Sequence, residues 1–357
     1  MKLPNNFPNV SDIPENIDDY LEQKESEVSD IYPYAEKTVF WNNSNKNKTK
    51  YSIVFIHGFT TTGYQSKEFL NKLSAELNAN LFVTRLSGHG VPYEGTKQMQ
   101  IDKIMYDVVE AIIIGERIGE NVILIGHSLG GALSMLAAND ELLSKKIDTL
   151  VLFAPGNSGI SPFAFMNTLI SSLVDRTGSL CWLIDCDPRS FMDLPEDEKW
   201  ENYLKIVPKD ERDNIMEAYG KRIEGKYGNK TKDKFMFNWA RWEEEILSLV
   251  PKTEKQVKKE LLKDNYYKSI AKMEYHYFKN NLFIPNNFLK NKKKYKLLKN
   301  IPVEIIHGRY DMVCPPYAAY ELHQLIPHSK LHFTIAGHTV TDEENKKKLI
   351  EITNKYV

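Results

Sequence analysis

Cysteine is scarce in this chain of 357 residues, and the few that occur form no recognisable framework. They are Cys181, Cys186 and Cys314, an odd number whose spacings match neither a disulfide scaffold nor a zinc site. This scarcity argues against a small secreted domain held together by disulfides. We therefore expect a protein of a reducing compartment, with a cytoplasmic location.

Long apolar runs and a dominant charge are missing too. No stretch approaches the ~20 apolar residues that a membrane-spanning helix needs, and the start, "MKLPNNFPNVSDIPENIDD", has no apolar region of a signal peptide. The formal net charge of −1 argues against general nucleic-acid binding. We expect a soluble protein whose partners include neither a membrane nor a nucleic acid.

The motifs of cofactor chemistry are also absent from the sequence. There is no His-Glu-x-x-His and no glycine-rich loop of the kind that cradles a phosphate. In "GHSLGG", Ser128 stands where a dinucleotide-binding fingerprint needs its second glycine. We predict neither a metal nor an organic cofactor.

What the sequence does contain is an alternation of short apolar strands with amphipathic helices. Apolar, β-branched runs of strand length recur on both sides of a long interruption, and segments with helical spacing separate them. The clearest strands are 51–59, 80–86, 148–155, 301–308 and 330–335. Such alternation predicts an α/β fold, with a doubly wound, mostly parallel sheet.

The interruption runs from residue 156 to residue 300. This block is helical, aromatic and charged, and it contains four of the five tryptophans. We therefore predict a core made of residues 49–155 and 301–357, with residues 156–300 inserted as a helical cap. Residues 1–48 are polar and acidic, and we expect them to form an N-terminal segment that wraps the surface.

One turn of the predicted core carries a nucleophile signature. The stretch "VILIGHSLGG" places the pattern Gly-x-Ser-x-Gly, centred on Ser128, between an apolar strand and a helix. A sharp strand-to-helix turn needs small flanking residues, because the serine backbone is strained and neighbouring chains crowd it. The turn exposes the hydroxyl at the carboxyl end of the strand. We predict that Ser128 is a catalytic nucleophile.

A serine nucleophile needs a base, and the base needs an orienting acid. Asp311 in "HGRYDMVCPP" and His338 in "FTIAGHT" each follow a predicted strand, at the sheet edge that also carries Ser128. They occur in the chain order serine, acid, histidine that is typical of this turn. His57 and His89 lie at the same edge but precede the serine. We therefore predict a triad of Ser128, Asp311 and His338.

Acyl transfer further requires two backbone N–H groups that stabilise the developing oxyanion. Leu129 directly follows the nucleophile and supplies one of them. The other is expected from Phe59, which follows the strand-ending "HG". We predict Phe59 and Leu129 as the oxyanion hole.

The sequences around the predicted serine, acid and histidine resemble those of the α/β-hydrolase superfamily. This resemblance covers roughly the whole chain outside the cap. The part from about Trp200 to His338 resembles a narrower group, the proline iminopeptidases (prolyl aminopeptidases). The matching pieces, in order, are "WENYLKIVPKDERDNIMEAYGKRI", "NWARWE", "AKMEYHYF", "IIHGRYDMVCPP", "ELHQLIP" and "AGH". That family removes an N-terminal proline from peptides with a serine triad.

The resemblance also implies substrate-binding residues. In the family, cap glutamates bind the free amino group of the substrate; here they correspond to Glu243 in "NWARWE" and Glu274 in "KMEYHYF". Cys314 falls where the family has a cysteine near the substrate pocket. A protonated amine would offset the cost of burying Glu274 among Met273 and aromatic neighbours. The alternative is that each glutamate pairs with a Lys or Arg of the cap.

The front half of the chain departs from the iminopeptidase pattern. Instead of His-Gly-Gly-Pro-Gly and Gly-Gly-Ser-Trp-Gly it has "HGFTT" and "GHSLG", which resemble esterases and monoacylglycerol lipase-like hydrolases.

Three hypotheses about the function follow. The first is an aminopeptidase that releases a proline-type residue through an acyl-enzyme on Ser128. The second is a carboxylesterase that cleaves an acyl ester or lactone with the same triad. The third is a hydrolase scaffold retained for binding. The first two imply a small-molecule or short-peptide substrate; the oligomeric state stays open.

Overall fold

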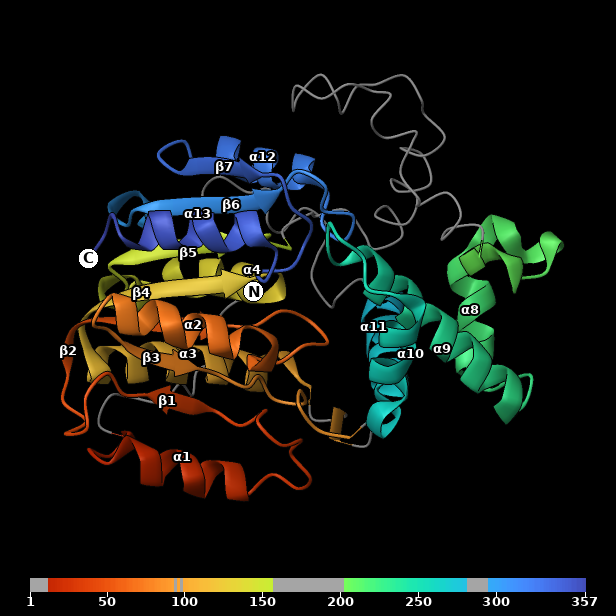
Figure 1. Ribbon diagram of the computed structural model, residues 1–357, viewed down its shortest axis with the longest axis horizontal. Coiled ribbons are helices and arrows are strands. Elements are labelled where there is room, and N and C mark those ends of the chain that lie inside the picture. Colours follow the sequence, from red (N-terminus) through yellow and green to blue (C-terminus); the bar gives the residue numbers. More distant parts are fainter. Residues whose placement is uncertain (1–11, 93–94, 97–98, 157–201, 281–294) are drawn as a thin grey trace.

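The computed structural model describes residues 12–92, 95–96, 99–156, 202–280 and 295–357. Its centre is a seven-stranded sheet with the strand order β1-β3-β2-β4-β5-β6-β7 (Figure 1). Only β1 runs antiparallel to its neighbour, and the other adjacent pairs are parallel. The predicted mostly parallel sheet is confirmed. The strands are β1 (Thr38–Phe40), β2 (Thr49–Ile56), β3 (Asn80–Val83), β4 (Gly119–His127), β5 (Thr149–Phe153), β6 (Val303–Gly308) and β7 (Lys330–Thr334).

The central strands are apolar because both faces of the sheet are covered. Every residue of β5 and β6 is buried, as expected for parallel strands with helices on each side. Helices α2 (Tyr64–Glu76) and α13 (Glu343–Thr353) pack on one face. Helices α3 (Ile101–Ile118), α4 (Leu129–Ala138) and α12 (Pro316–Leu325) pack on the other. The sheet is therefore doubly wound, as predicted.

The insertion between β5 and β6 forms a separate helical layer beyond the carboxyl ends of the strands (Figure 1). It has its own apolar core, in which Tyr219 stacks on Tyr203 and contacts Trp239 edge-on. The described helices are α8 (Ile215–Ile223), α9 (Asn229–Ile246), α10 (Glu254–Leu262) and α11 (Tyr266–Lys279). Residues 157–201, and with them Cys181 and Cys186, lie outside the described residues.

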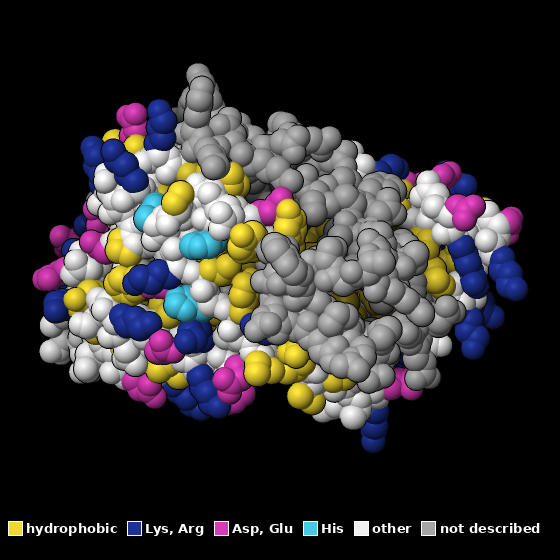
Figure 2. All heavy atoms as spheres, turned by 90° about the horizontal axis from the view of Figure 1, so that it is seen from above, with side chains coloured by type: hydrophobic (Ala, Val, Ile, Leu, Met, Phe, Trp, Pro, Cys, Tyr) yellow, Lys and Arg dark blue, Asp and Glu magenta, His cyan; other side chains and the backbone are white. Residues whose placement is uncertain are grey.

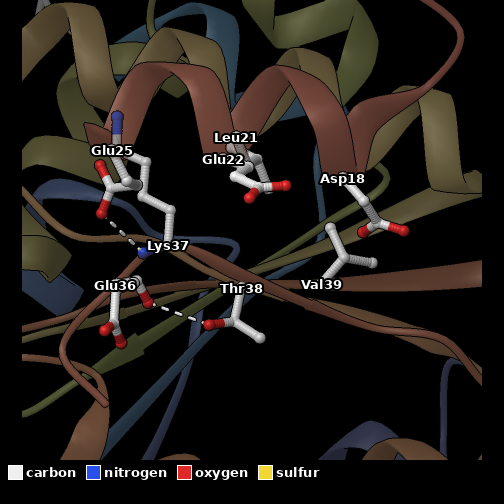
Figure 3. Close-up of a pocket in the computed structure, with 8 residues that line it drawn as sticks. All are labelled: Asp18, Leu21, Glu22, Glu25, Glu36, Lys37, Thr38 and Val39. Carbon is white, nitrogen blue, oxygen red and sulfur yellow. Dashed lines mark hydrogen bonds between the residues drawn. The ribbon is translucent and has the colours of Figure 1, made fainter. Parts of the chain in front are cut away.

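The N-terminal segment does more than wrap the surface. Helix α1 (Ile17–Ser26) buries Ile17, Tyr20 and Leu21 against the core, and β1 extends the sheet. Because the segment contains many acidic residues, its overall composition gives no indication of this apolar stripe. The apolar residues nevertheless have the spacing of an amphipathic helix. Figure 3 shows Glu25 of α1 reaching toward β1, where it accepts a hydrogen bond from the Lys37 backbone at 3.0 Å.

Charged side chains show no concentration of one sign on the face seen in Figure 2. Lys and Arg side chains are interspersed with Asp and Glu over its described surface, in keeping with the net charge of −1. Among the helices that the structure describes, none is long and apolar enough to cross a membrane.

Candidate active site

Ser128 occupies the sharp turn between β4 and α4. Its backbone has φ 52° and ψ −117°, a strained conformation for a residue other than glycine, costing of order 1–3 kcal/mol. The two flanking glycines allow this turn. A Cβ atom on Gly126 would lie 2.4 Å from the carbonyl oxygen of Gly130, and one on Gly130 would lie 2.1 Å from that of Ile56. The small residues of the motif are therefore a steric requirement.

Backbone hydrogen bonds hold the strained serine in place. The N–H of Ser128 donates to the carbonyl of Phe153 in β5 at 2.9 Å. The Ser128 carbonyl accepts from Gly131 in α4 and from Gly156 beyond β5, each at 3.0 Å. The neighbouring strand β5, the residue that follows its end and helix α4 thus fix the backbone of the serine.

The predicted acid and histidine meet at the same edge of the sheet. His338, after β7, and Asp311, after β6, form a hydrogen bond of 2.8 Å between Nδ1 and Oδ2. The other carboxylate oxygen of Asp311 accepts from the backbone N–H groups of Val313 and Cys314, at 2.9 and 2.8 Å. The aspartate is therefore held by its own loop and orients the imidazole.

The electrostatics of this pair favour an ionised acid. Burial disfavours the carboxylate of Asp311, but the His338 ring and the backbone donors outweigh burial, so the pKa of Asp311 lies below its ordinary value. For His338 burial acts in the opposite sense; the negative charge and hydrogen bond of Asp311 outweigh it and raise the pKa of the imidazole. The pair is suited to stabilise an imidazolium during catalysis.

Two further histidines adjoin the pair. His307, which the sequence analysis did not assign to the site, lies with Nε2 3.4 Å from Oδ2 of Asp311 and donates to the Cys314 carbonyl at 2.7 Å. His127 contacts the His338 carbonyl through Nε2 at 3.0 Å. Burial lowers the pKa of both rings, so they are neutral near pH 7.

The two predicted oxyanion-hole residues flank the serine. Leu129 is the first residue of α4, and the first N–H groups of a helix have no acceptor within the helix. A Cβ atom on Gly58 would lie 3.2 Å from Cβ of Ser128, so the chain just before Phe59 runs against the nucleophile. The Phe59 ring contacts Tyr277 and Phe278 of α11 and so touches the cap.

Glu274 of α11 is buried deep in the cap, with 3% of its surface exposed. Its carboxylate accepts a hydrogen bond from the indole Nε1 of Trp239 at 2.5 Å, and the Thr60 side chain also bonds to it. Burial raises the pKa of Glu274 well above its ordinary value, and the nearby charge of Glu243 raises it further.

Glu243 of α9 links the cap carboxylates to the predicted triad. Burial raises its pKa to about 7, while the positive His338 ring opposes that rise and the charges of Glu244 and Asp311 add to it. Glu243 thus lies within electrostatic reach of both His338 and Asp311. Cys314 belongs to the same group: burial raises the pKa of its thiol, which is in hydrogen-bonding contact with the Ser128 side chain.

The two residues that follow Glu243 in α9 form ion pairs, whereas Glu243 and Glu274 form none with the residues that the structure describes. Glu244 forms an ion pair with Lys252 at 2.9 Å, and Glu245 forms one with Arg241 at 2.6 Å. Within the described ranges, no Lys or Arg forms an ion pair with Glu243 or Glu274. The alternative that each pairs with a basic residue of the cap therefore fails for that part of the chain. No cluster of His, Cys, Asp and Glu among the same residues fits a metal ion.

Comparison with known proteins gives the class of the chain. Residues 53–351 match the alpha/beta hydrolase family. The chain therefore belongs to that family. The solved structure of olei00960, a hydrolase from Oleispira antarctica, superposes with a TM-score of 0.53 at 14% identity, covering 89% of this chain and 94% of that one. At that identity the likeness concerns the fold.

Among curated sequences, this chain is similar to proline iminopeptidases. It is 30% identical over 163 residues to the "Probable proline iminopeptidase" of Leptolyngbya boryana, which is 45% of this chain and 49% of that protein. The chain thus spans about half the length of the first curated relatives that it matches. It is 24% identical over 335 residues to the "Proline iminopeptidase" of Neisseria gonorrhoeae, covering 91% and 93% of the two chains.

Proposed function

We propose that this protein is a serine aminopeptidase of the proline iminopeptidase type, acting in the cytoplasm on short peptides with a free N-terminal amine. The observation that carries the proposal is two cap carboxylates without a Lys or Arg partner in the described part of the chain: Glu274 is buried, and the half-buried Glu243 lies within electrostatic reach of His338. Leaving such groups buried and unpaired is costly. A bound ammonium or iminium group would remove that cost.

Catalysis would begin with proton transfer from Ser128. Because Nδ1 of His338 is bonded to Asp311, Nε2 is the nitrogen that remains to accept the serine proton. Oγ of Ser128 then attacks the carbonyl of the first residue, and the N–H groups of Leu129 and Phe59 stabilise the oxyanion. His338 returns the proton to the leaving amine, and the acyl-enzyme forms. Water, activated by the same histidine, releases the residue.

The cap carboxylates would limit cleavage to the first residue of a peptide. Burial raises the pKa of both carboxyl groups, and the charge of Glu243 adds to the rise at Glu274, so a proton is retained at the cap carboxylates near neutral pH. A cationic amine would displace that proton. The indole of Trp239 fixes the Glu274 carboxylate, and aromatic side chains such as Phe278 supply an apolar wall. Cys314 would lie against the scissile end of the substrate, beside Ser128.

A carboxylesterase with the same triad is the second candidate. Its support comes from the front half, where "HGF" and "GHSLGG" resemble esterases, and from the contact of Phe59 with Tyr277 and Phe278. Such an aromatic group beside the oxyanion strand would suit an acyl chain or a lactone ring. In that case the cap glutamates would bind some other polar group.

The test compares proline p-nitroanilide with a short p-nitrophenyl ester, using the wild type and Ser128→Ala. We expect rapid release from the anilide, and a loss of about 10⁴-fold or more in kcat in the variant. Release from the ester alone would favour the esterase. Anilide or ester hydrolysis that survives in Ser128→Ala would overturn both candidates.

A further inference from the structure

The loop that carries His338 is bonded to the cap as well as to Asp311. Backbone N–H groups of His338 and Thr339 donate to one carbonyl, that of Leu247, at 2.8 and 3.2 Å. Leu247 is the residue directly after α9, one turn beyond Glu243. The backbone position of the histidine is therefore defined partly by the cap.

Asp342 strengthens this connection with its side chain. One carboxylate oxygen, Oδ2, accepts from the N–H of Gly337 at 2.7 Å and from the N–H of Leu249 at 3.1 Å. The first donor precedes His338, and the second lies in the cap. Asp342 is the N-cap residue of α13, where an aspartate commonly caps its own helix; here its side chain makes no capping bond. The carboxylate bridges two other segments.

The two segments are in close contact. A Cβ atom on Gly337 would lie 2.8 Å from the N atom of Leu249 and 2.9 Å from the carbonyl oxygen of Leu247. On the other side of the histidine loop, a Cβ atom on Gly308 would lie 2.1 Å from the carbonyl oxygen of Gly337. Little room exists for the histidine loop to shift without moving the cap.

We propose that Asp342 is a positioning residue, whose carboxylate clamps the histidine loop to the cap segment Leu247–Leu249 and so holds His338 in its productive place only while the cap is docked. This inference rests on the proposed triad, but it is independent of whether the substrate is an amide or an ester. It makes the cap a component of the catalytic machinery as well as a lid over the substrate.

The clamp also adds negative charge near the imidazole. Asp342 supports the positive form of His338, as do Asp311 and Glu243, whereas His127 and His307 face the ring as neutral groups. Removal of one negative charge weakens the preference for the imidazolium. Loss of Asp342 should therefore move the acid limb of the triad's pH profile toward lower pH.

The experiment measures the rate constant for phosphonylation of Ser128 by a fluorophosphonate probe, across a range of pH. Asp342→Ala removes both hydrogen bonds, Asp342→Asn keeps an acceptor but loses the charge, and Glu343→Gln removes a neighbouring charge that makes neither bond. We expect Asp342→Ala to react about 10- to 100-fold more slowly, because small displacements of a catalytic group have large effects. Asp342→Asn should be intermediate with its acid limb at lower pH, and Glu343→Gln should match the wild type.

The final extent of labelling separates misfolding from misplacement. A residue that only supports the fold would lower the fraction of protein that reacts, and leave the rate constant and pH profile of the folded fraction unchanged. That result in Asp342→Ala and Asp342→Asn would overturn the clamp. Labelling that persists in Ser128→Ala would instead overturn the proposed triad.

Discussion

The carboxylates beneath α1 and those of the cap differ in their partners: the first have basic side chains bonded to them, whereas among the described residues Glu243 and Glu274 have no Lys or Arg partner. Beneath α1, Glu25 bonds to the Arg85 guanidinium at 2.7 and 2.8 Å, and Lys37 bonds to Asp107 and Glu110 at 2.8 and 2.5 Å. In the cap, the buried Glu274 has one indole and one hydroxyl as partners and lies within electrostatic reach of the half-buried Glu243, and among the described residues neither has a Lys or Arg partner.

The pKa directions reflect this difference. Burial disfavours the charge of Glu25, yet Arg85 outweighs burial and the pKa of Glu25 is lowered. Burial raises the pKa of Glu274, and no cation reverses it. A buried acid with a resident partner contributes to the fold, whereas a buried acid without one beside a nucleophile favours a function that brings the partner as substrate. Removing a basic partner beneath α1, or a carboxylate charge in the cap, tests this difference.

The largest effect is expected from Lys37→Met, in the paired region. The substitution leaves Asp107 and Glu110 buried without their cation, and breaking such a pair costs about 3–5 kcal/mol of folding stability. Because the bonds of Lys37 do not involve Ser128, Asp311 or His338, kcat measured well below the unfolding transition should be unchanged. Chemical denaturation and steady-state kinetics check the two parts. A loss of kcat with intact stability would show that the network serves the active site.

Glu274→Gln should have a smaller and substrate-selective effect. A hydrogen bond to a charged group is worth about 1.5–3 kcal/mol, so kcat/KM for proline p-nitroanilide should fall roughly 10- to 100-fold. Turnover of a p-nitrophenyl ester should stay near that of the wild type. Glu254→Gln, the same change at an exposed position of α10, is the matched control. Equal losses on both substrates would remove Glu274 from the amine site.

The smallest effect concerns stability against pH in Glu243→Gln. The pKa of Glu243 is raised from 4.5 to about 7, so its favourable contribution is present at low pH and is lost as pH rises through the folded value. Glutamine cannot ionise and avoids that loss. The variant should therefore gain stability relative to the wild type on going from about pH 5 to about pH 8. If the difference in unfolding free energy between variant and wild type did not change with pH, the raised pKa of Glu243 would be contradicted.

The sequence was a good guide where structure depends on local signals. The positions of Ser128, Asp311 and His338 at one edge of the sheet could be predicted, because each residue follows a strand and the carboxyl ends of parallel strands meet at one edge. The same holds for the alternation of strands and helices, whose period is visible in short windows.

Other features depend on contacts between residues far apart in the chain and gave no local signal. Leu249 and Asp342 are 93 residues apart. The local sequence around Asp342, "TDEEN", does not indicate that the aspartate bonds to the cap. His307 looked like an ordinary strand residue, although it adjoins Asp311. The burial of α1 was missed since its acidic residues dominate the composition. Trp239 gives no local signal of a role, because the hydrogen bond from its indole N–H goes to Glu274, 35 residues further along the chain.

The central claim is that Glu243 and Glu274, which have no Lys or Arg partner among the described residues, bind the free amine of the substrate. The most direct test measures kcat/KM of the wild type for proline p-nitroanilide and for its N-acetylated form, in which the ring nitrogen is an uncharged amide that carries an acetyl group. We predict a preference of roughly 10²-fold or more for the free amine, from the loss of a charged hydrogen bond. Equal rates, or faster cleavage of the acetylated compound, would contradict the claim.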